Sequence, residues 1–352
     1  MNYGSRITTL IIFPHHFNIK KNQNLDYFIS LVLLFVLMFV YFRIAHKYGI
    51  IDKPNHRSAH TEITLRGGGI IFPVAFLLLI GTQQVTNFGS SLSHYLPFGI
   101  GLGVICTISF IDDIVDLSRM IRVLFHFISV SLLLYFLNAF ELLPIWLIPV
   151  VYVFIIGILN AYNFMDGING MTGLYSLIAL SSLLYVNVNG IQFAGSDFVV
   201  YPILACIVFL FFNFRKKAKC FMGDIGSMGI AFWVIALVGL LMIKTGELKW
   251  ILFLTVYGIE VVFTILERLK LKENIFEAHR RHLYQLLVNE KKISHLTVSS
   301  LYAGIQLIIN FAVISVNSSE IIIFALTLIP VAILYLYIKF SVKNQILSKI
   351  NL

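Results

Sequence analysis

Long apolar stretches recur along almost the whole of this 352-residue chain. They begin near Leu25, Gly68, Tyr95, Ile121, Leu143, Met171, Phe198, Gly229, Trp250, Leu296 and Ile321. A helix needs about 20 apolar residues to cross the hydrocarbon core of a bilayer. Because a chain in lipid must satisfy its own backbone hydrogen bonds, such stretches form helices. The spacing therefore predicts an all-α, polytopic integral membrane protein with about eleven transmembrane helices.

The composition leaves little room for a soluble domain. Hydrophobic residues make up 59% of the chain and charged residues only 12%, whereas soluble domains carry about 25% charged residues. The three cysteines, Cys106, Cys206 and Cys220, lack the spacing of a disulfide framework or a metal site. We therefore expect one transmembrane domain over residues 25–340. A non-cytoplasmic segment, 1–24, precedes it and a cytoplasmic tail, 341–352, follows it.

Basic residues are distributed unevenly between the alternating connections of an eleven-helix chain. Twenty-one of the 26 Lys and Arg residues fall on one side, and the other side has Arg6, Lys20, Lys21, Lys244 and Lys249. Since the cytoplasmic side of a membrane protein is enriched in Lys and Arg, this distribution predicts an external N-terminus and a cytoplasmic C-terminus. The net charge of +9 then reflects orientation, and we expect no nucleic-acid partner. The dense polar clusters also fall on the cytoplasmic side.

Three aspartates stand where one apolar stretch ends: Asp112, Asp113 and Asp116. Carboxylates at a membrane boundary are costly without a partner, and close like charges repel one another. A divalent cation removes both problems, and carboxylate oxygens suit Mg²⁺ better than zinc. The cluster predicts a metal site at the membrane surface, and the alternative is a solvated acidic helix end.

Amide side chains and one carboxylate gather in a later cytoplasmic loop: Asn160, Asn163, Asp166 and Asn169. Such groups can bind the polar edges of a sugar or of uracil, or complete a metal shell. The alternative is a glycine-rich turn held by local Asx hydrogen bonds.

A third cluster opens an apolar helix with a carboxylate, Asp224, between Gly223 and Gly226. The free amides of a helix N-terminus bind phosphate, and Asp224 could reach the same metal as Asp112. The alternative is an Asp that only caps its own helix.

A fourth cluster combines two histidines with two arginines: His279, Arg280, Arg281 and His282. Arginine makes planar, bidentate contacts with phosphate, so these residues suit a diphosphate or a sugar, unless the loop is only an orientation signal. Two further features stay open. The glycine run after Arg66 is either a flexible entry to the next helix or an approach point for a ligand, and the intramembrane Glu260 is either functional or a helix-packing hydrogen bond.

Together these segments resemble the polyprenyl-phosphate N-acetylhexosamine-1-phosphate transferases, the glycosyltransferase family 4 group that includes the WecA- and MraY-type enzymes. The resemblance covers about residues 25–340 and follows family order. The matching segments are 53–60 with 66–69, 112–118, 160–170, 223–227 and 279–282.

The resemblance implies that undecaprenyl phosphate attacks the sugar-side phosphorus of a UDP-N-acetyl sugar by direct displacement and that UMP leaves. It implies Mg²⁺, with Mn²⁺ as an alternative, near the catalytic residues Asp112, Asp113 and Asp224. Asp112 would act as the base that activates the lipid phosphate. The implied substrate-binding residues are Asn160, Asn163, Asp166, Asn169, His279, Arg280, Arg281, His282 and Asp116.

Departures from the peptidoglycan-precursor branch narrow this expectation. That branch has Lys near the position of Asp116, Asp at the position of Asn169, and a triple-His loop, and this chain has none of these. The 279–285 loop looks closer to the O-antigen-initiating, WbpL-like branch, whose donors include deoxy-sugars such as N-acetylfucosamine and N-acetylquinovosamine. We therefore expect a multi-pass enzyme of the bacterial inner membrane, in contact with membrane lipids, with a cytoplasmic active site and with a homodimer left open. The alternatives are the phospho-MurNAc-pentapeptide transferase and a transporter of lipid-linked sugars.

Overall fold

The computed structural model describes residues 23–52, 63–86, 91–115, 117–274 and 279–350. Within these ranges ten helices are long and apolar enough to cross a membrane, and residues Gly68–Gln83 form a shorter apolar helix. The prediction of an all-α polytopic membrane protein is confirmed. Ten of the eleven predicted stretches are full-length spans, and the stretch that begins at Gly68 is the short one.

The described residues form thirteen α-helices, many of which follow one another after a few connecting residues. The first seven are α1 (Gln23–Tyr48), α2 (Ile71–Thr86), α3 (Ser91–Val115), α4 (Arg119–Phe136), α5 (Ala139–Leu142), α6 (Ile148–Met165) and α7 (Met171–Asn189). The others are α8 (Ser196–Asn213), α9 (Gly223–Thr245), α10 (Thr255–Lys270), α11 (Leu283–Asn289), α12 (His295–Ser315) and α13 (Glu320–Ile350). Three short 3-10 helices are η1 (Gly68–Ile70), η2 (Ile145–Leu147) and η3 (Leu248–Leu254), and two short strands, β1 (Ile51–Asp52) and β2 (Thr64–Leu65), pair antiparallel.

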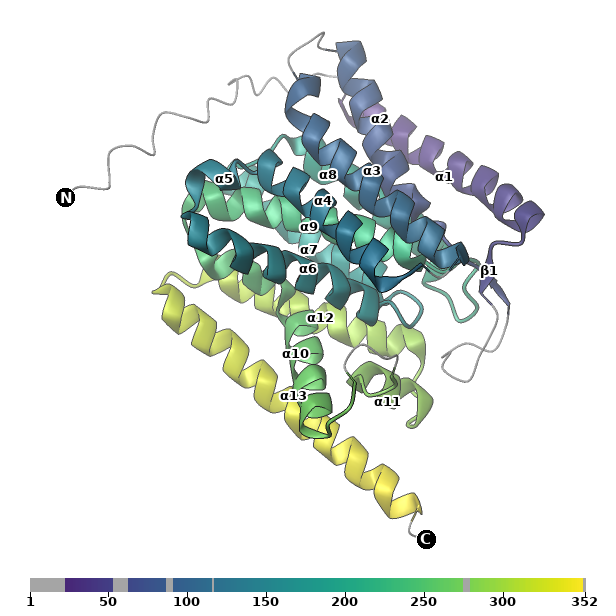
Figure 1. The fold of residues 1–352 in the computed structure, drawn as a ribbon, viewed down its shortest axis with the longest axis vertical. Helices are drawn as coiled ribbons and strands as arrows, with labels where there is room; N and C mark the ends of the chain where they lie inside the picture. The colour runs from purple at the N-terminus through teal and green to yellow at the C-terminus, as the bar shows by residue number, and fades with distance from the viewer. Residues whose placement is uncertain (1–22, 53–62, 87–90, 116, 275–278, 351–352) are drawn as a thin grey trace, which may run out of the picture.

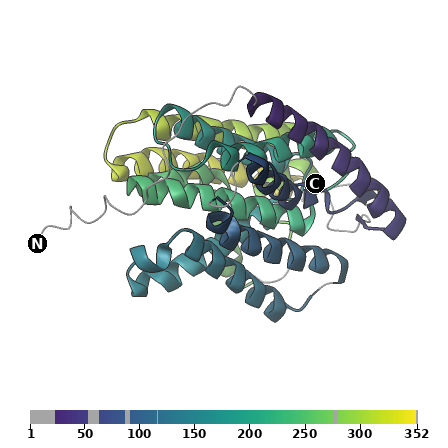
Figure 2. The ribbon, with the colours of Figure 1, turned by 90° about the horizontal axis from the view of Figure 1, so that it is seen from above.

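Helix α9 is the centre of the bundle. Within its apolar window 83% of the residues are buried, against 17% in α13. It packs against α3, α6 and α7, and Trp233 in its middle donates a hydrogen bond to the Phe198 carbonyl at 3.0 Å. Figure 1 shows α1 and α13 along opposite edges of the molecule, and Figure 2 gives the view from above. A helix that is apolar all round is expected in such a buried position.

The glycine run before α2 lies in direct backbone contact with the segment that leads into α9. Gly68 N donates to Phe221 O at 2.8 Å, and Gly69 N donates to Met222 O at 2.9 Å. A Cβ added at Gly69 would lie 2.1 Å from the Cα of Gly226. The run is therefore a point of close approach between two backbones, a packing role that the sequence did not predict. This contact also fixes the position of the residue that precedes the run, Arg66.

Candidate active site

A cavity of about 720 Å³ opens between the ends of α3, α4, α6, α9 and α10 and the segment 279–285. Six of the residues predicted from the sequence to form the site meet there. These six are Asp112, Asn160, Asn163, Asp224, His279 and His282. Much of the remaining lining is apolar, including Ile108, Val123, Ile156, Met228, Val261 and Ile265. The cavity thus combines carboxylates, amides and imidazoles with an apolar wall.

Asp113 caps the start of α9 from a neighbouring helix. Its Oδ2 accepts hydrogen bonds from the backbone N–H groups of Asp224 at 2.9 Å and Ile225 at 3.5 Å. Gly223 lies between the two helices with a φ of 72°, and a Cβ there would lie 2.6 Å from the same Oδ2. Only glycine adopts this left-handed conformation at little cost and leaves room for the carboxylate.

The expectation of free amides for a phosphate at the start of α9 is wrong for these two N–H groups. They are already satisfied by Asp113, whose side chain is 1% exposed. A buried carboxylate needs hydrogen-bond donors, and a helix N-terminus supplies them together with a favourable dipole. Asp113 itself is not among the residues that line the cavity. The sequence alternative in which Asp224 caps its own helix is also excluded, because the cap comes from α3.

Arg66 bridges the two carboxylates. Its Nη2 lies 2.6 Å from Asp113 Oδ1 and 3.6 Å from Asp224 Oδ1. Burial alone would lower the pKa of Arg66, but the nearby charges of Asp113 and Asp224 outweigh burial, so the pKa is raised. Arg66 therefore stays positively charged and offsets part of the repulsion between the aspartates.

Asp112 contacts Leu117 and the start of α4. Its Oδ1 accepts a hydrogen bond from Leu117 N at 2.7 Å, and its Oδ2 accepts one from Arg122 Nη1 at 3.0 Å. Leu117 N and Arg122 thus hold the carboxylate at the cavity wall. The third aspartate of the predicted cluster, Asp116, lies outside the described residues.

The donor set around Arg66 fits a divalent cation that also binds substrate phosphate. Asp113 and Asp224 lie close enough to share one cationic nitrogen. Across the described part of the chain, no three His, Cys, Asp or Glu side chains are grouped to hold a metal ion by themselves. Protein sites for Mg²⁺ commonly use only one or two carboxylates and complete the shell with water and substrate phosphates. Asp224 at the wall of the cavity, with Asp113 on the other side of Arg66, is compatible with that mode of binding.

The amide loop at the end of α6 contributes to the cavity through its first two asparagines. Asn163 Nδ2 donates to Ser227 Oγ on α9 at 3.3 Å, and Asn160 Nδ2 donates to Ile156 O at 2.8 Å. Asp166 is half-buried one turn later. Burial, reinforced by the charge of Asp224 and partly offset by that of Arg66, raises the pKa of Asp166 to about 7.

Asn169, by contrast, links the loop to neighbouring helices. Its side chain donates to Arg215 O at 2.8 Å, its own carbonyl accepts from Ser299 Oγ at 2.8 Å, and the residue is only 4% exposed. The next backbone N–H, that of Gly170, donates to Asn213 Oδ1 at 2.6 Å. These contacts hold the loop in place, and a substrate role for Asn169 stays a prediction.

The four residues of the segment 279–282 differ in where their side chains lie. His279 and His282 line the cavity. Arg281 faces carboxylates instead, since its Nε donates to Glu273 Oε2 at 2.9 Å and its Nη1 lies 3.5 Å from Glu267 Oε1. Arg280 is exposed and is not among the residues that line the cavity. Substrate contacts by the two arginines stay predictions.

Three cavity arginines and one histidine on helices were not predicted as site residues: Arg119, Arg122, Arg268 and His126. Arg119 and Arg122 were counted only as orientation charges. Their spacing of three residues at the start of an apolar helix puts both on one face, a signal that the sequence does contain. Arg268 donates from Nη2 to Asn274 O at 2.5 Å and so ties the end of α10 to the loop after it.

The environment of His279 predicts acid-sensitive stability. Burial, with His282 and Arg268 nearby, lowers the pKa of His279 to about 4. The unfolded chain takes up a proton on this residue below about pH 6.5, whereas the folded protein does not until about pH 4. This contribution to stability is therefore full above about pH 6.5 and is lost as the pH falls toward 4.

We expect His279→Gln to reduce the loss of folding stability that occurs as the pH falls. The decrease in unfolding temperature between about pH 7 and pH 5 should be smaller than in the wild type by about 2 °C. Thermal unfolding in detergent at the two pH values measures it, with His46→Gln at the exposed end of α1 as the matched control. Equal decreases in the wild type and in the His279 variant would contradict the assigned environment.

Several known proteins are similar in sequence to this chain. Residues 95–243 match the family described as glycosyl transferase family 4. Over 282 residues the chain is 28% identical to a probable undecaprenyl-phosphate N-acetylglucosaminyl 1-phosphate transferase of Bacillus subtilis, covering 74% of this chain and 76% of that protein. It is 26% identical over 281 residues to the undecaprenyl-phosphate alpha-N-acetylglucosaminyl 1-phosphate transferase of Escherichia coli K12, covering 73% and 74%.

A mycobacterial relative extends the comparison. Over 210 residues the chain is 29% identical to the decaprenyl-phosphate N-acetylglucosaminephosphotransferase of Mycolicibacterium smegmatis, covering 53% of this chain and 52% of that protein. These matches support the family resemblance predicted from the sequence motifs. The matched residues 95–243 include the aspartates, the amide loop and Asp224, but they end before the 279–282 segment.

Proposed function

From the glycosyl transferase family 4 region at residues 95–243, we propose that this chain is a sugar-1-phosphate transferase. It transfers the sugar-1-phosphate of a UDP-N-acetylhexosamine to undecaprenyl phosphate and releases UMP. The relatives are named for N-acetylglucosaminyl transfer, which makes UDP-N-acetylglucosamine the first donor to test. The lipid-linked product would start an O-antigen or another cell-surface glycan.

The observation that carries this proposal is the composition of one cavity. Asp112, Asp224 and three arginines share it with a wall of apolar side chains from α3, α4, α6 and α10. A donor diphosphate needs cations and hydrogen-bond donors, whereas a polyprenyl acceptor needs an apolar surface beside its phosphate. A transporter of lipid-linked sugars usually binds its cargo near the bilayer midplane, whereas these polar groups gather at the ends of the helices.

Different residues of the cavity have different roles in the proposed transfer. Arg122 and Arg268 neutralise phosphate oxygens, and Asn163 and His282 orient the donor. Asp112, held at one oxygen by Leu117 N, accepts the proton of the acceptor phosphate. An oxygen of that phosphate then forms a bond with the sugar-side phosphorus, and the bond to the bridging oxygen breaks, so that UMP leaves with the electron pair.

A divalent cation, Mg²⁺ in our proposal, would be held by Asp113 and Asp224 with contributions from substrate phosphates. When bound, it neutralises charge that develops on the diphosphate. Arg66 already supplies a positive charge between these carboxylates. Positioning and charge neutralisation are the main contributions that proteins make to phosphoryl transfer.

The orientation of the chain follows from its charges. Twenty-one of the 26 basic residues lie on the side of the predicted spans that also carries the cavity residues. By the positive-inside rule this side faces the cytoplasm of a bacterial inner membrane. Both UDP-sugars and the phosphate end of the acceptor are available there.

The proposed activity is tested with purified protein, undecaprenyl phosphate, Mg²⁺ and a panel of UDP-N-acetyl sugars. We expect UMP release that depends on all three additions, with UDP-N-acetylglucosamine or a deoxy derivative as the preferred donor. Replacement of Mg²⁺ by EDTA is expected to stop the reaction, and Mn²⁺ to restore part of it. Folded protein that releases no UMP from any donor would overturn the proposed function.

A further inference from the structure

A buried carboxylate that the transfer scheme does not use lies directly behind the cavity. Glu260 on α10 is 0% exposed. Its Oε1 accepts a hydrogen bond from Leu283 N at 2.5 Å, and its Oε2 accepts one from Tyr302 OH at 2.6 Å. Acidic residues inside a membrane protein are costly and usually carry a function. Its position next to the 279–285 segment indicates what that function is.

Glu260 faces the ring of a cavity residue. Its Oε1 lies 3.4 Å from Nδ1 of His282, whose side chain is 4% exposed. Both ring nitrogens are buried, and neither has a hydrogen-bond partner among the residues that the structure describes, so that Nε2 has no polar neighbour comparable to Glu260. The ring is stacked on Tyr284 with a centroid distance of 5.6 Å and lies tilted against His279 at 4.9 Å. His282 therefore has one nitrogen beside a carboxylate and one that a ligand can satisfy.

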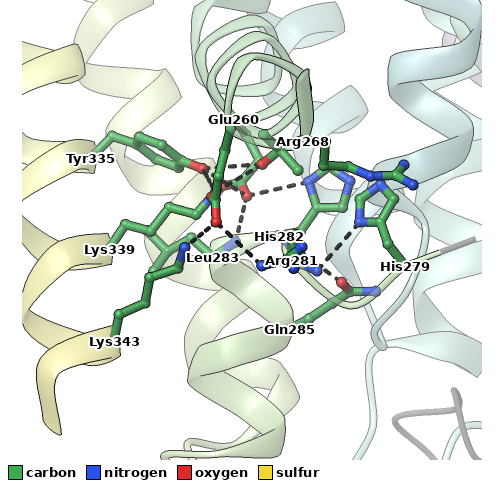
Figure 3. A network of polar contacts seen from close by, with 12 residues as sticks. Glu260, Arg268, His279, Arg281, His282, Leu283, Gln285, Tyr335, Lys339 and Lys343 are labelled. Atoms are coloured by element: carbon green, nitrogen blue, oxygen red, sulfur yellow. Dashed lines mark hydrogen bonds and ion pairs between the residues drawn. The ribbon is translucent and has the colours of Figure 1, made fainter. Parts of the chain in front are cut away.

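The last helix holds Glu260 from the other side. Tyr335 OH on α13 lies 3.5 Å from Glu260 Oε1, and the buried Lys339 donates to Tyr335 OH at 2.7 Å. Lys339 also pairs with Glu267 Oε2 at 2.9 Å. Figure 3 shows the α13 side chains on one side of Glu260 and His282 on the other. A continuous set of polar contacts thus runs from α13 to the wall of the cavity.

From these contacts we infer that Glu260 is the positioning residue for His282 and sets the affinity of the site for the diphosphate or sugar oxygens of a nucleotide-sugar donor. This inference rests on the proposed function for the class of ligand. A carboxylate opposite one imidazole nitrogen fixes the orientation of the ring and favours a proton on the facing nitrogen. Nε2 is then the ring nitrogen that contacts the donor.

The alternative is that Glu260 only holds the loop through Leu283 N. A double-mutant cycle separates the two roles, because residues that act through one another are not additive. Glu260→Gln keeps an acceptor oxygen and the side-chain volume but removes the charge that faces His282. His282→Ala removes the ring and leaves the Leu283 hydrogen bond in place.

The measurement is calorimetric binding of UDP-N-acetylglucosamine to the full chain with Mg²⁺ and without acceptor, so that it does not depend on turnover. We expect Glu260→Gln to weaken binding by about 10-fold, and His282→Ala by a similar factor. The double variant should bind no more weakly than His282→Ala. In turnover assays Glu260→Gln should raise KM for the donor more than it lowers kcat.

Two outcomes would overturn the inference: unchanged affinity in Glu260→Gln, or effects of the two substitutions that multiply in the double variant. If Glu260→Gln does not fold, Tyr335→Phe, which removes the α13 contact to Glu260, gives the same cycle with a smaller effect. Glu290→Gln, at an exposed position beyond α11, is the matched control. Wild-type protein that binds the donor but releases no UMP would contradict the proposed transfer and still allow the cycle to be measured.

Discussion

Asp224→Asn is expected to reduce the rate of UMP release by roughly 10³-fold or more while the protein stays folded. The side chain lines the cavity and is 27% exposed, and its ion pair with Arg66 spans 3.6 Å. An amide keeps the shape but removes the charge that a divalent cation or Arg66 requires. Partly exposed ion pairs contribute only about 0–1 kcal/mol to stability. The loss should therefore appear in turnover and not in the unfolding temperature.

Glu290→Gln provides the matched control for this change. It makes the same carboxylate-to-amide substitution at an exposed residue outside the cavity and should leave turnover unchanged. Rates are compared at saturating donor and acceptor, with size-exclusion profiles as the measure of folding. An Asp224→Asn protein within tenfold of wild-type turnover would remove Asp224 from the proposed chemistry.

Gly69→Ala is expected to have the largest effect on stability. The added Cβ would lie 2.1 Å from Gly226 Cα and 2.8 Å from Met222 O, and both are backbone atoms. No side chain can rotate to relieve this overlap, so η1 and the start of α9 must separate. Overpacking of this kind costs about 1–3 kcal/mol or more, which lowers the unfolding temperature by roughly 5 °C. Since Arg66 precedes this contact, turnover should also fall.

Gly81→Ala makes the same substitution on α2 where nothing lies within 4 Å of the new Cβ. Alanine favours a helix over glycine by about 1 kcal/mol, so this control should be neutral or slightly stabilising. Thermal unfolding of the two variants side by side measures the difference. Equal unfolding temperatures would show that the close approach of the two backbones does not limit stability.

Much of the fold is predictable from the sequence because apolar length is a local property. The stretches that begin near Tyr95, Met171 and Trp250 each contain a helix of the structure. The stretch at Gly68 is shorter than a full span, since α2 ends at Thr86 after an initial 3-10 turn. That difference depends on where the helix ends, and local composition does not determine it.

The candidate site was predictable in its parts but not in its pairings. The clusters around Asp112, Asn163, Asp224 and His282 do meet at one cavity. Arg66 was grouped with a loop, whereas it joins two aspartates that are 111 residues apart in the sequence. Such long-range contacts are set by helix packing, and no periodicity in a single sequence reports them. The same reason separates Glu260 from its partner on α13, Tyr335.

One measurement tests the proposed transfer most directly: the fate of the sugar-side phosphate. UDP-N-acetylglucosamine labelled with ³²P at that phosphate is incubated with the protein, Mg²⁺ and undecaprenyl phosphate, and the lipid and aqueous phases are separated. If the protein transfers a sugar-1-phosphate, the label moves into the lipid phase in proportion to the UMP released, and Asp224→Asn abolishes the transfer. Label that stays in the aqueous phase as UDP while the sugar moves to lipid would contradict the account.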